Sequence, residues 1–121
     1  MSSPPKVSIV MPAYNVSTYI GETLDSVFAQ TWTDYEVIVV NDGSPDTVEL
    51  ERALGPYRPR IRYIKQNNLG AGAARNEGLR AAQGEFIAFL DADDLWFPNY
   101  LEEQLRFIRE NDYDLVCADA M

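Results

Sequence analysis

Short apolar runs recur along the chain, and they predict β-strands. Their positions are 7–11, 36–40, 61–64, 86–90 and 114–118. Most of these runs are rich in β-branched residues and are apolar at successive rather than alternate positions. Such runs are typical of strands that are covered on both faces, as in a parallel sheet.

The segments between the first runs carry the spacing of amphipathic helices. Apolar residues within 20–28 recur on one helix face, and Ser17 and Thr18 stand where an N-terminal cap is expected. Further on, Ser44 and Pro45 have the pattern of an N-cap followed by the first helical residue. We therefore predict a helix after each of the first two strands.

Two further helices are predicted in the second half of the chain. The segment 71–82 is rich in alanine, and Gly84 stands where it would terminate that helix. After Pro98, apolar residues at positions 101, 105 and 108 line one face of a fourth helix.

Strand and helix thus alternate from one end of the chain to the other. This alternation predicts right-handed βαβ units and an α/β fold, an open, mostly parallel sheet with helices on both faces. The length of 121 residues fits a single domain, 1–121. Ligands of such sheets bind beyond the carboxyl ends of the strands, so residues at these ends are candidates for function.

The charge balance narrows the class of partner. Nineteen acidic against ten basic residues give a formal charge of −9, which disfavours nucleic acid and anionic lipid. The chain has no histidine, which excludes histidine-based triads and histidine metal ligands. Cys117 is the single cysteine, and the start of the chain lacks a signal-peptide pattern. A reducing, cytoplasmic compartment is therefore expected.

Polar and aromatic residues follow three of the predicted strands. Tyr14 comes after the first strand, Asp42 after the second, and Asp91, Asp93 and Asp94 after the fourth. Two carboxylates about 5 Å apart, at an effective dielectric constant of about 20, repel each other by about 3 kcal/mol. A divalent cation, Mg²⁺ or Mn²⁺, would remove that penalty, and a diphosphate bridged by it would be the matching ligand. Tyr14 offers a flat face to a base.

Structural interpretations of the same residues remain. Asp91, Asp93 and Asp94 could form an acidic cluster at the N-terminus of the fourth helix, where the helix dipole favours negative charge, although we favour the cation. Asp42 could be a turn residue before a helix. Tyr14 could be a packed loop aromatic.

The segment 67–76 contains two glycines near a helix start, which would suit a phosphate. It is not a dinucleotide-binding fingerprint, because Arg75 takes the place of the third glycine and the segment follows the third strand. An arginine among small residues needs a carboxylate or phosphate partner if it is buried.

Taken together, four segments of the sequence resemble the family-2 glycosyltransferases. These segments are 7–15, 40–44, 70–76 and 89–94, in the order and at the separations that the family has. The resemblance implies an inverting enzyme with the A-type, Rossmann-like fold that binds nucleotide sugars. UDP-sugars would be the commonest donors, dTDP-sugars would come next, and Mg²⁺ or Mn²⁺ would be the cofactor.

By matching position, the resemblance implies roles for the residues after the first two strands. The loop of Pro12, Ala13 and Tyr14 would hold the nucleobase, with Tyr14 against its face. Asp42 would accept a hydrogen bond from the imide N–H of uracil or thymine. Arg75 would lie near the base and ribose, or it would brace Asp42.

The acids after the fourth strand would serve the rest of the donor. The resemblance implies that Asp91 would contact the ribose and that Asp93 would bind the cation that bridges the diphosphate. Asp94 is a neighbour with no assigned role. The reaction implied is a single displacement at the anomeric carbon, with inversion. Its general base is expected beyond Met121, in an acceptor-binding half that the family has and this sequence lacks.

We therefore expect the chain to be the donor-binding part of a glycosyltransferase, inactive on its own. A later antiparallel strand of the family pattern is missing, which would leave a sheet edge exposed. This edge predicts self-association or a displaced C-terminal segment. A role in polysaccharide biosynthesis and contact of the intact protein with a membrane are compatible with the family.

Two other functions compete with this prediction. A nucleotidyl-transferring enzyme on a similar fold would carry a glycine-rich, basic loop after the first strand, and 12–15 has neither glycine nor charge. A non-catalytic nucleotide-binding or interaction module on the same half fold is the alternative that the sequence leaves standing.

Overall fold

A parallel sheet of four strands organises the protein, in the order β3-β2-β1-β4. The computed structural model describes residues 5–111. The strands are β1 (Val7–Ala13), β2 (Tyr35–Asp42), β3 (Arg62–Gln66) and β4 (Phe86–Phe89). All three pairings between neighbouring strands are parallel, as the alternation of strand and helix predicted.

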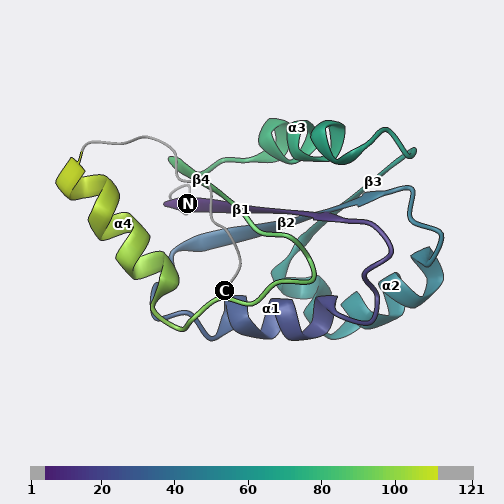
Figure 1. Cartoon of the computed structure of the whole chain (residues 1–121), viewed down its shortest axis with the longest axis horizontal. Helices are drawn as coiled ribbons and strands as arrows, with labels where there is room; N and C mark the ends of the chain where they lie inside the picture. Colours follow the sequence, from purple (N-terminus) through teal and green to yellow (C-terminus); the bar gives the residue numbers. More distant parts are fainter. Residues whose placement is uncertain (1–4, 112–121) are drawn as a thin grey trace.

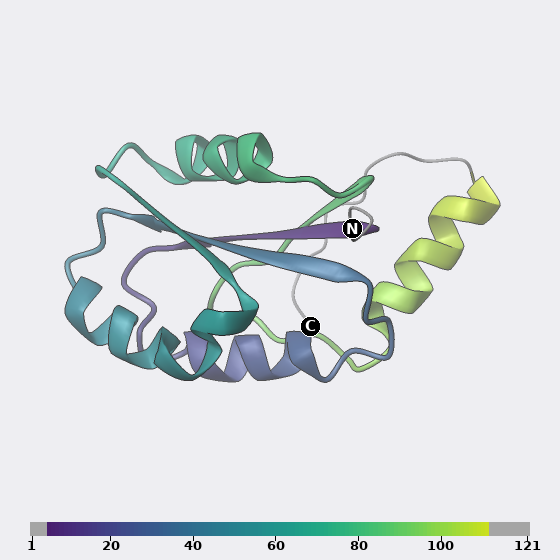
Figure 2. The same ribbon diagram turned by 180° about the vertical axis from the view of Figure 1, so that it is seen from behind.

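Helices cover both faces of this sheet. They are α1 (Ile20–Phe28), α2 (Thr47–Leu54), α3 (Ala71–Ala81) and α4 (Tyr100–Asn111), with a short 3-10 helix η1 (Gly55–Arg60) after α2. Helix α3 lies on one face, and α1 and α2 lie on the other (Figure 1), an arrangement that is also clear from behind (Figure 2). The predicted fold class is thus confirmed. The predicted strand 114–118 lies outside the described residues, and with it the expectation of a displaced C-terminal segment.

Strand register brings the carboxyl ends of three strands to one edge. Ala13 of β1 pairs with Asn41 of β2, and Asp42 pairs with Gln66 of β3. The predicted strand 7–11 continues for two more residues, through Pro12 to Ala13. Beyond Val10, β4 no longer pairs with β1, so Pro12 lies where one neighbour remains and its missing N–H is tolerated.

Three of the predicted helix ends are corrected by hydrogen bonds to neighbouring segments. No side chain caps α1, because Tyr19 rather than Ser17 or Thr18 is at its N-cap, and the backbone N–H of Ser17 donates to the Asp46 carboxylate. Helix α2 begins at Thr47 rather than at Pro45, with Asp46 at its N-cap position. Gly84 does not terminate α3, which ends at Ala81. Instead its N–H donates to the Ser8 hydroxyl, so close that an added Cβ would lie 2.6 Å from the Ser8 nitrogen.

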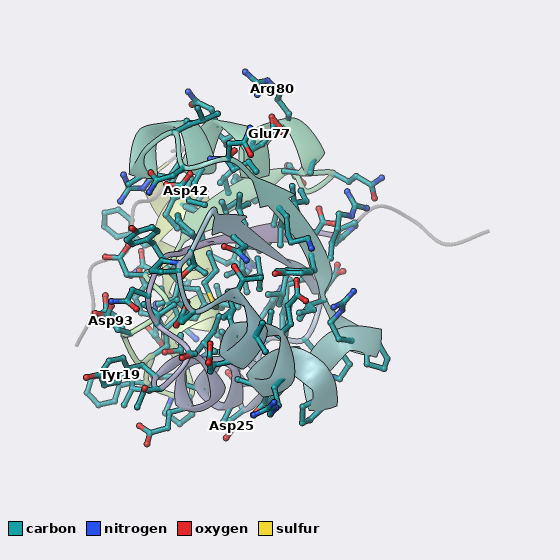
Figure 3. The ribbon with its side chains drawn as sticks, turned by 90° about the vertical axis from the view of Figure 1, so that its right-hand side faces the viewer. Tyr19, Asp25, Asp42, Glu77, Arg80 and Asp93 are labelled. Atoms are coloured by element: carbon teal, nitrogen blue, oxygen red, sulfur yellow. The ribbon has the colours of Figure 1, made fainter. Side chains whose placement is uncertain are left out.

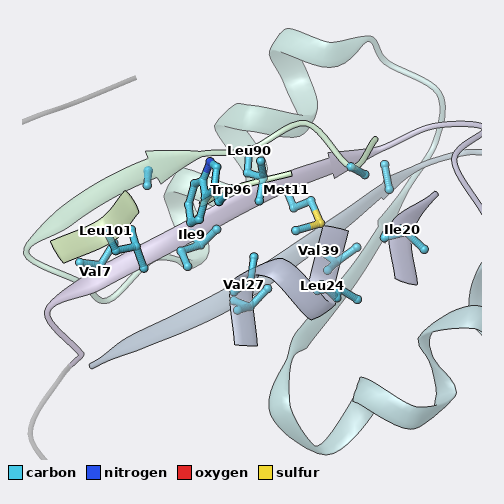
Figure 4. Close-up of a cluster of buried hydrophobic side chains, with 14 of the residues drawn as sticks. Val7, Ile9, Met11, Ile20, Leu24, Val27, Val39, Leu90, Trp96 and Leu101 are labelled. Atoms are coloured by element: carbon cyan, nitrogen blue, oxygen red, sulfur yellow. The ribbon is translucent and has the colours of Figure 1, made fainter. Parts of the chain in front are cut away.

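The two faces of the sheet are packed differently. On the side of α1, large apolar side chains interlock in the main core, among them Met11, Leu24 and Trp96 (Figure 4). The predicted apolar face of α4 joins this core. On the side of α3 a smaller cluster includes Val40 and Ala74. Small residues let α3 approach the sheet closely, which explains its alanine-rich and glycine-rich sequence.

Within the described part of the chain, no helix has both the length and the apolar character needed to span a membrane.

We predict that Gly78→Ala lowers the free energy of unfolding by about 2 kcal/mol, because overpacking forces side chains and backbone to shift. The added Cβ would lie 2.2 Å from Cγ1 of Val10. Gly72→Ala in the same helix is the matched control, since nothing lies within 4 Å of its added Cβ. It should raise the free energy of unfolding by about 0.5 kcal/mol. Urea unfolding of both variants checks this, and a Gly78→Ala protein as stable as the wild type would contradict it.

Candidate functional site

A cavity of about 520 Å³ opens at the carboxyl edge of the sheet. The ends of β1 and β2, the loops after β1, β3 and β4, and the start of α3 all contribute to its wall. Its lining residues are Pro12, Ala13, Tyr14, Val16, Asp42, Asn68, Gly70, Ala71, Ala74, Arg75, Asp91, Ala92 and Asp93. Every one of the seven residues to which the sequence led us to give a binding role lies on this wall. Their roles remain predictions, but their convergence is an observed feature of the fold.

Asp42 is the buried acid of the cavity, with 5% of its surface exposed. Its Oδ1 accepts hydrogen bonds from Gln66 Nε2 and from the Leu69 N–H, both at 2.8 Å, and its Oδ2 accepts one from the Gly70 N–H at 3.0 Å. Burial alone would raise the pKa of Asp42, but the hydrogen bonds from Gln66, Leu69 and Gly70 outweigh it and lower the pKa. Asp42 is therefore an ionised carboxylate that fastens the loop after β3 to the end of β2.

Arg75 pairs with Asp91 and not with Asp42. Its guanidinium nitrogen lies 3.8 Å from Oδ1 of Asp91, and the two side chains are 43% and 62% exposed. Arg75 therefore does not brace Asp42, whose recorded partners in the described part of the chain are Gln66 and the N–H groups of Leu69 and Gly70. At this separation the pair is weak, and both charged groups are accessible from the cavity.

The acids after β4 lie on a tight turn. The Asp94 N–H donates to the Asp91 carbonyl oxygen at 3.1 Å, and the intervening Ala92 is buried with its carbonyl oxygen accepting from Thr23 Oγ1 at 2.9 Å. This anchor leaves Asp91 and Asp93 exposed on either side of Ala92. Figure 3 shows Asp93 and Asp42 along the same side of the molecule.

The alternative of an acidic cluster at a helix N-terminus is wrong. Helix α4 begins only at Tyr100, and the acids in its first turn are Glu102 and Glu103. Asp91 and Asp93 precede the helix by more than one turn, where a helix dipole has no strong effect.

The described residues do not form a ready-made metal centre. Over residues 5–111 no group of three or more acidic, cysteine or histidine side chains converges in a way that could hold an ion. The repulsion that we expected among the acids is relieved in other ways, by three donors at Asp42 and by Arg75 at Asp91. Asp42 and Asp91 thus have partners within the protein, and Asp93 and Asp91 still offer oxygen ligands to the cavity.

The sequence reasoning missed the residues that fix the loops of the cavity. Ser44 and Pro45 have the sequence pattern of a helix start, whereas the Ser44 hydroxyl accepts a hydrogen bond from the Asn15 N–H at 2.7 Å. Asp46, which we did not single out, accepts from the Ser17 N–H at 2.9 Å. The signal was a serine and an aspartate two residues apart after a strand, a pair that can hold a neighbouring loop as well as a helix.

Comparison with known proteins is consistent with the geometry of the cavity. The sequence profile of the family described as Glycosyl transferase family 2 matches residues 8–121. The chain is 37% identical over 121 residues to an Escherichia coli (strain K12) protein named as the uncharacterized glycosyltransferase YibD, covering 99% of this chain and 35% of that protein. The protein described here therefore belongs to glycosyl transferase family 2.

Solved structures of related proteins share the fold. Staphylococcus aureus TarS 1–349 in complex with UDP matches with a TM-score of 0.79 at 34% identity, over 88% of this chain and 33% of that one. The mannosyltransferase PcManGT from Pyrobaculum calidifontis, in complex with GDP-Man and Mn²⁺, matches with a TM-score of 0.64 at 31% identity, over 78% of this chain and 29% of that one. The chain thus spans about a third of the length of each of these relatives.

We predict that Asp42→Asn lowers the free energy of unfolding at about pH 7 by about 1–3 kcal/mol. The amide NH₂ group replaces one carboxylate oxygen, so a donor faces an N–H group that needs an acceptor. The folded-state pKa of Asp42 lies below its ordinary value of 3.8. Its stabilising contribution is therefore complete above that ordinary value and is lost as the pH falls through the lower, folded-state pKa. The difference in the free energy of unfolding between wild type and Asp42→Asn should therefore shrink as the pH is lowered through that pKa.

Urea unfolding from about pH 7 downward, to the lowest pH at which both proteins fold, measures this difference. Asp34→Asn is the control, since Asp34 is an exposed aspartate at the opposite end of the same strand. It should change the free energy of unfolding by no more than about 0.5 kcal/mol. A wild-type advantage over Asp42→Asn that does not vary with pH would contradict the role given to the Asp42 charge.

Proposed function

We propose that this chain binds the nucleotide part of a nucleotide-diphosphate sugar, with UDP as the preferred nucleotide, and serves as the donor-binding part of an inverting glycosyltransferase. One observation carries the proposal: a single cavity brings together an aromatic ring, an ionised carboxylate, an arginine and two exposed carboxylates. Family membership supports it, as do the complexes of related structures with UDP and with GDP-Man.

The nucleobase lies between Tyr14 and Asp42 in this proposal. Tyr14 is 48% exposed at the cavity, so its ring face is free to stack on a base. An ionised carboxylate has about four acceptor positions, and three donors leave Asp42 with one on Oδ2. Since an ionised carboxylate only accepts, it selects a base that presents an N–H, as the imide of uracil does.

Ribose and diphosphate extend from there toward the loop after β4. Asp91 accepts hydrogen bonds from ribose hydroxyls, and the nearby Arg75 guanidinium keeps its charge balanced. Arg75 also faces the cavity on the first turns of α3, where a cation attracts the negative charge of a diphosphate.

A divalent cation fits the residues that are present. Magnesium in nucleotide sites is commonly held by one or two carboxylates together with the substrate phosphates, so it does not need the three-carboxylate cluster that the described residues lack. Asp93 is the residue that would hold it, because its carboxylate is exposed on the cavity wall and makes no ion pair within residues 5–111. When bound there, Mg²⁺ or Mn²⁺ supplies charge neutralisation to the departing diphosphate.

Transfer itself is a single displacement at the anomeric carbon. The acceptor hydroxyl forms the new bond from the face opposite the diphosphate, the bond from the anomeric carbon to the diphosphate oxygen breaks, and a general base takes the hydroxyl proton. The charged groups of the cavity are all committed to the donor in this proposal. We therefore assign the base to a residue outside the cavity.

We predict that UDP together with Mn²⁺ raises the thermal unfolding temperature of the chain, and that Asp93→Ala abolishes the part of the rise that depends on the metal. The reason is that a ligand bound only to the folded state stabilises it by mass action. Asp34→Ala removes the same charge at a site remote from the cavity and should leave the whole response intact. If no nucleoside diphosphate produces a shift, with or without metal, the interaction-module alternative takes the place of the proposal.

The base selectivity follows from the charge state of Asp42. We predict that UDP binds at least about tenfold more tightly than CDP, because the cytosine ring nitrogen that replaces the uracil N–H is an acceptor and would face a carboxylate. Isothermal titration with both nucleotides at equal metal concentration measures the ratio. Equal affinities would show that Asp42 does not read the base.

A further inference from the structure

The loop that carries Tyr14 adopts a backbone conformation that needs support. Asn15, the next residue, has a φ of 56°, in the left-handed region that residues other than glycine rarely adopt and that asparagine adopts more readily than most of them. Its N–H donates to the Ser44 hydroxyl at 2.7 Å, and the N–H of Ser17 donates to Asp46 Oδ2 at 2.9 Å. Both ends of this turn are therefore held by side chains of the loop after β2.

Asp46 joins these two attachments into one unit. The Ser44 hydroxyl donates to Asp46 Oδ1, so the same carboxylate holds Ser17 directly and Asn15 through Ser44. Ser44 is fixed in turn from the sheet, because its N–H donates to Oδ1 of the buried Asn41 at 2.9 Å. The result is a continuous hydrogen-bonded path from β2 to the turn that follows Tyr14.

Asp46 is at the start of a helix, but its carboxylate binds the neighbouring turn instead of that helix. Asp46 is the N-cap residue of α2, where an aspartate ordinarily accepts a hydrogen bond from the first turn of its own helix. No such bond is present, and the carboxylate instead bonds to Ser44 and Ser17. Burial alone would raise the pKa of Asp46, but the hydrogen bonds from Ser44 and Ser17 lower it, so the acceptor is ionised at neutral pH.

We propose that Asp46 is a positioning residue that sets the place of Tyr14 at the cavity by fastening the turn 15–17 to the loop after β2. The inference rests on the proposed function, in which Tyr14 stacks on the nucleobase. Asp46 does not line the cavity and is not required to touch the nucleotide. Its effect on binding passes through Tyr14.

A double-mutant cycle separates this role from a purely structural one. The variants are Asp46→Ser, Tyr14→Ala and the two combined, and the measured quantity is UDP affinity with Mn²⁺ by isothermal titration. Serine is a good N-cap, so Asp46→Ser preserves any capping of α2, but its shorter side chain does not reach Ser17. Asp46→Asn, which keeps the length and one acceptor oxygen, is the conservative variant and completes the cycle if Asp46→Ser does not fold.

We expect Tyr14→Ala to weaken UDP binding about tenfold, since that is within the range that base stacking on an aromatic ring contributes. Asp46→Ser should weaken it by about fivefold to tenfold, and the double variant should be no weaker than Tyr14→Ala alone, because coupled residues do not add. Glu49→Gln, which removes an exposed acid from the first turn of the same helix, is the matched control and should leave the affinity unchanged. Losses that simply add in the double variant would overturn the proposal, as would an Asp46→Ser protein that binds UDP normally.

Amide hydrogen exchange gives a readout that does not depend on UDP. In the free protein, Asp46→Ser should speed exchange of the Asn15 and Ser17 N–H groups, whose acceptors are lost or displaced, and leave the amides of β2 protected. If Asp46→Ser speeds this exchange but leaves UDP affinity unchanged, the positioning role is refuted and the proposed function is not. A wild-type chain that binds no UDP would refute the proposed function and this inference with it.

Discussion

The cavity depends on two carboxylates, one at the end of β2 and one in the loop that follows it, which accept hydrogen bonds from backbone N–H groups of neighbouring loops. Asp42 holds the loop after β3 through Leu69 and Gly70, and Asp46 holds the loop after β1 through Ser17. Each loop would otherwise leave N–H groups without these acceptors at the carboxyl edge of the sheet, where an unpaired buried N–H is costly. Because both acids extend from the end of β2, one strand sets the relative positions of three loops.

This arrangement explains how an acidic chain accommodates several carboxylates at a common site. Asp42 is stabilised by neutral donors in a buried position, while Asp91 has Arg75 as its partner and Asp93 remains in contact with water. The cavity therefore combines a fixed, buried acceptor at one end with exposed charges at the other. A nucleotide has the complementary order, with a flat base that needs directional hydrogen bonds and a diphosphate that needs charge and a cation.

The fold and the membership of the cavity could be predicted from the sequence because both follow from local patterns. Apolar runs such as that of β1 and the alanine-rich α3 indicate their own structure, and parallel strands bring their carboxyl ends together by geometry alone. Hydrogen-bond partners could not be predicted in the same way. The sequence around Asp46 does not indicate that its carboxylate accepts a hydrogen bond from Ser17, 29 positions away, rather than from its own helix. In the same way, the sequence alone could equally have paired Arg75 with Asp42. Those choices depend on tertiary distances of a few tenths of a nanometre.

An NMR titration of the chain with UDP and Mg²⁺ tests the central claim most directly, because it locates the nucleotide residue by residue. The account predicts that the amide signals of Asn15, Gly70 and Asp93 shift together and saturate at one UDP per chain, since these residues belong to three loops around one cavity. Amides of η1, which does not line the cavity, should stay in place. Shifts that are confined to another surface, or no shifts at saturating UDP and metal, would contradict a nucleotide site at the carboxyl edge of this sheet.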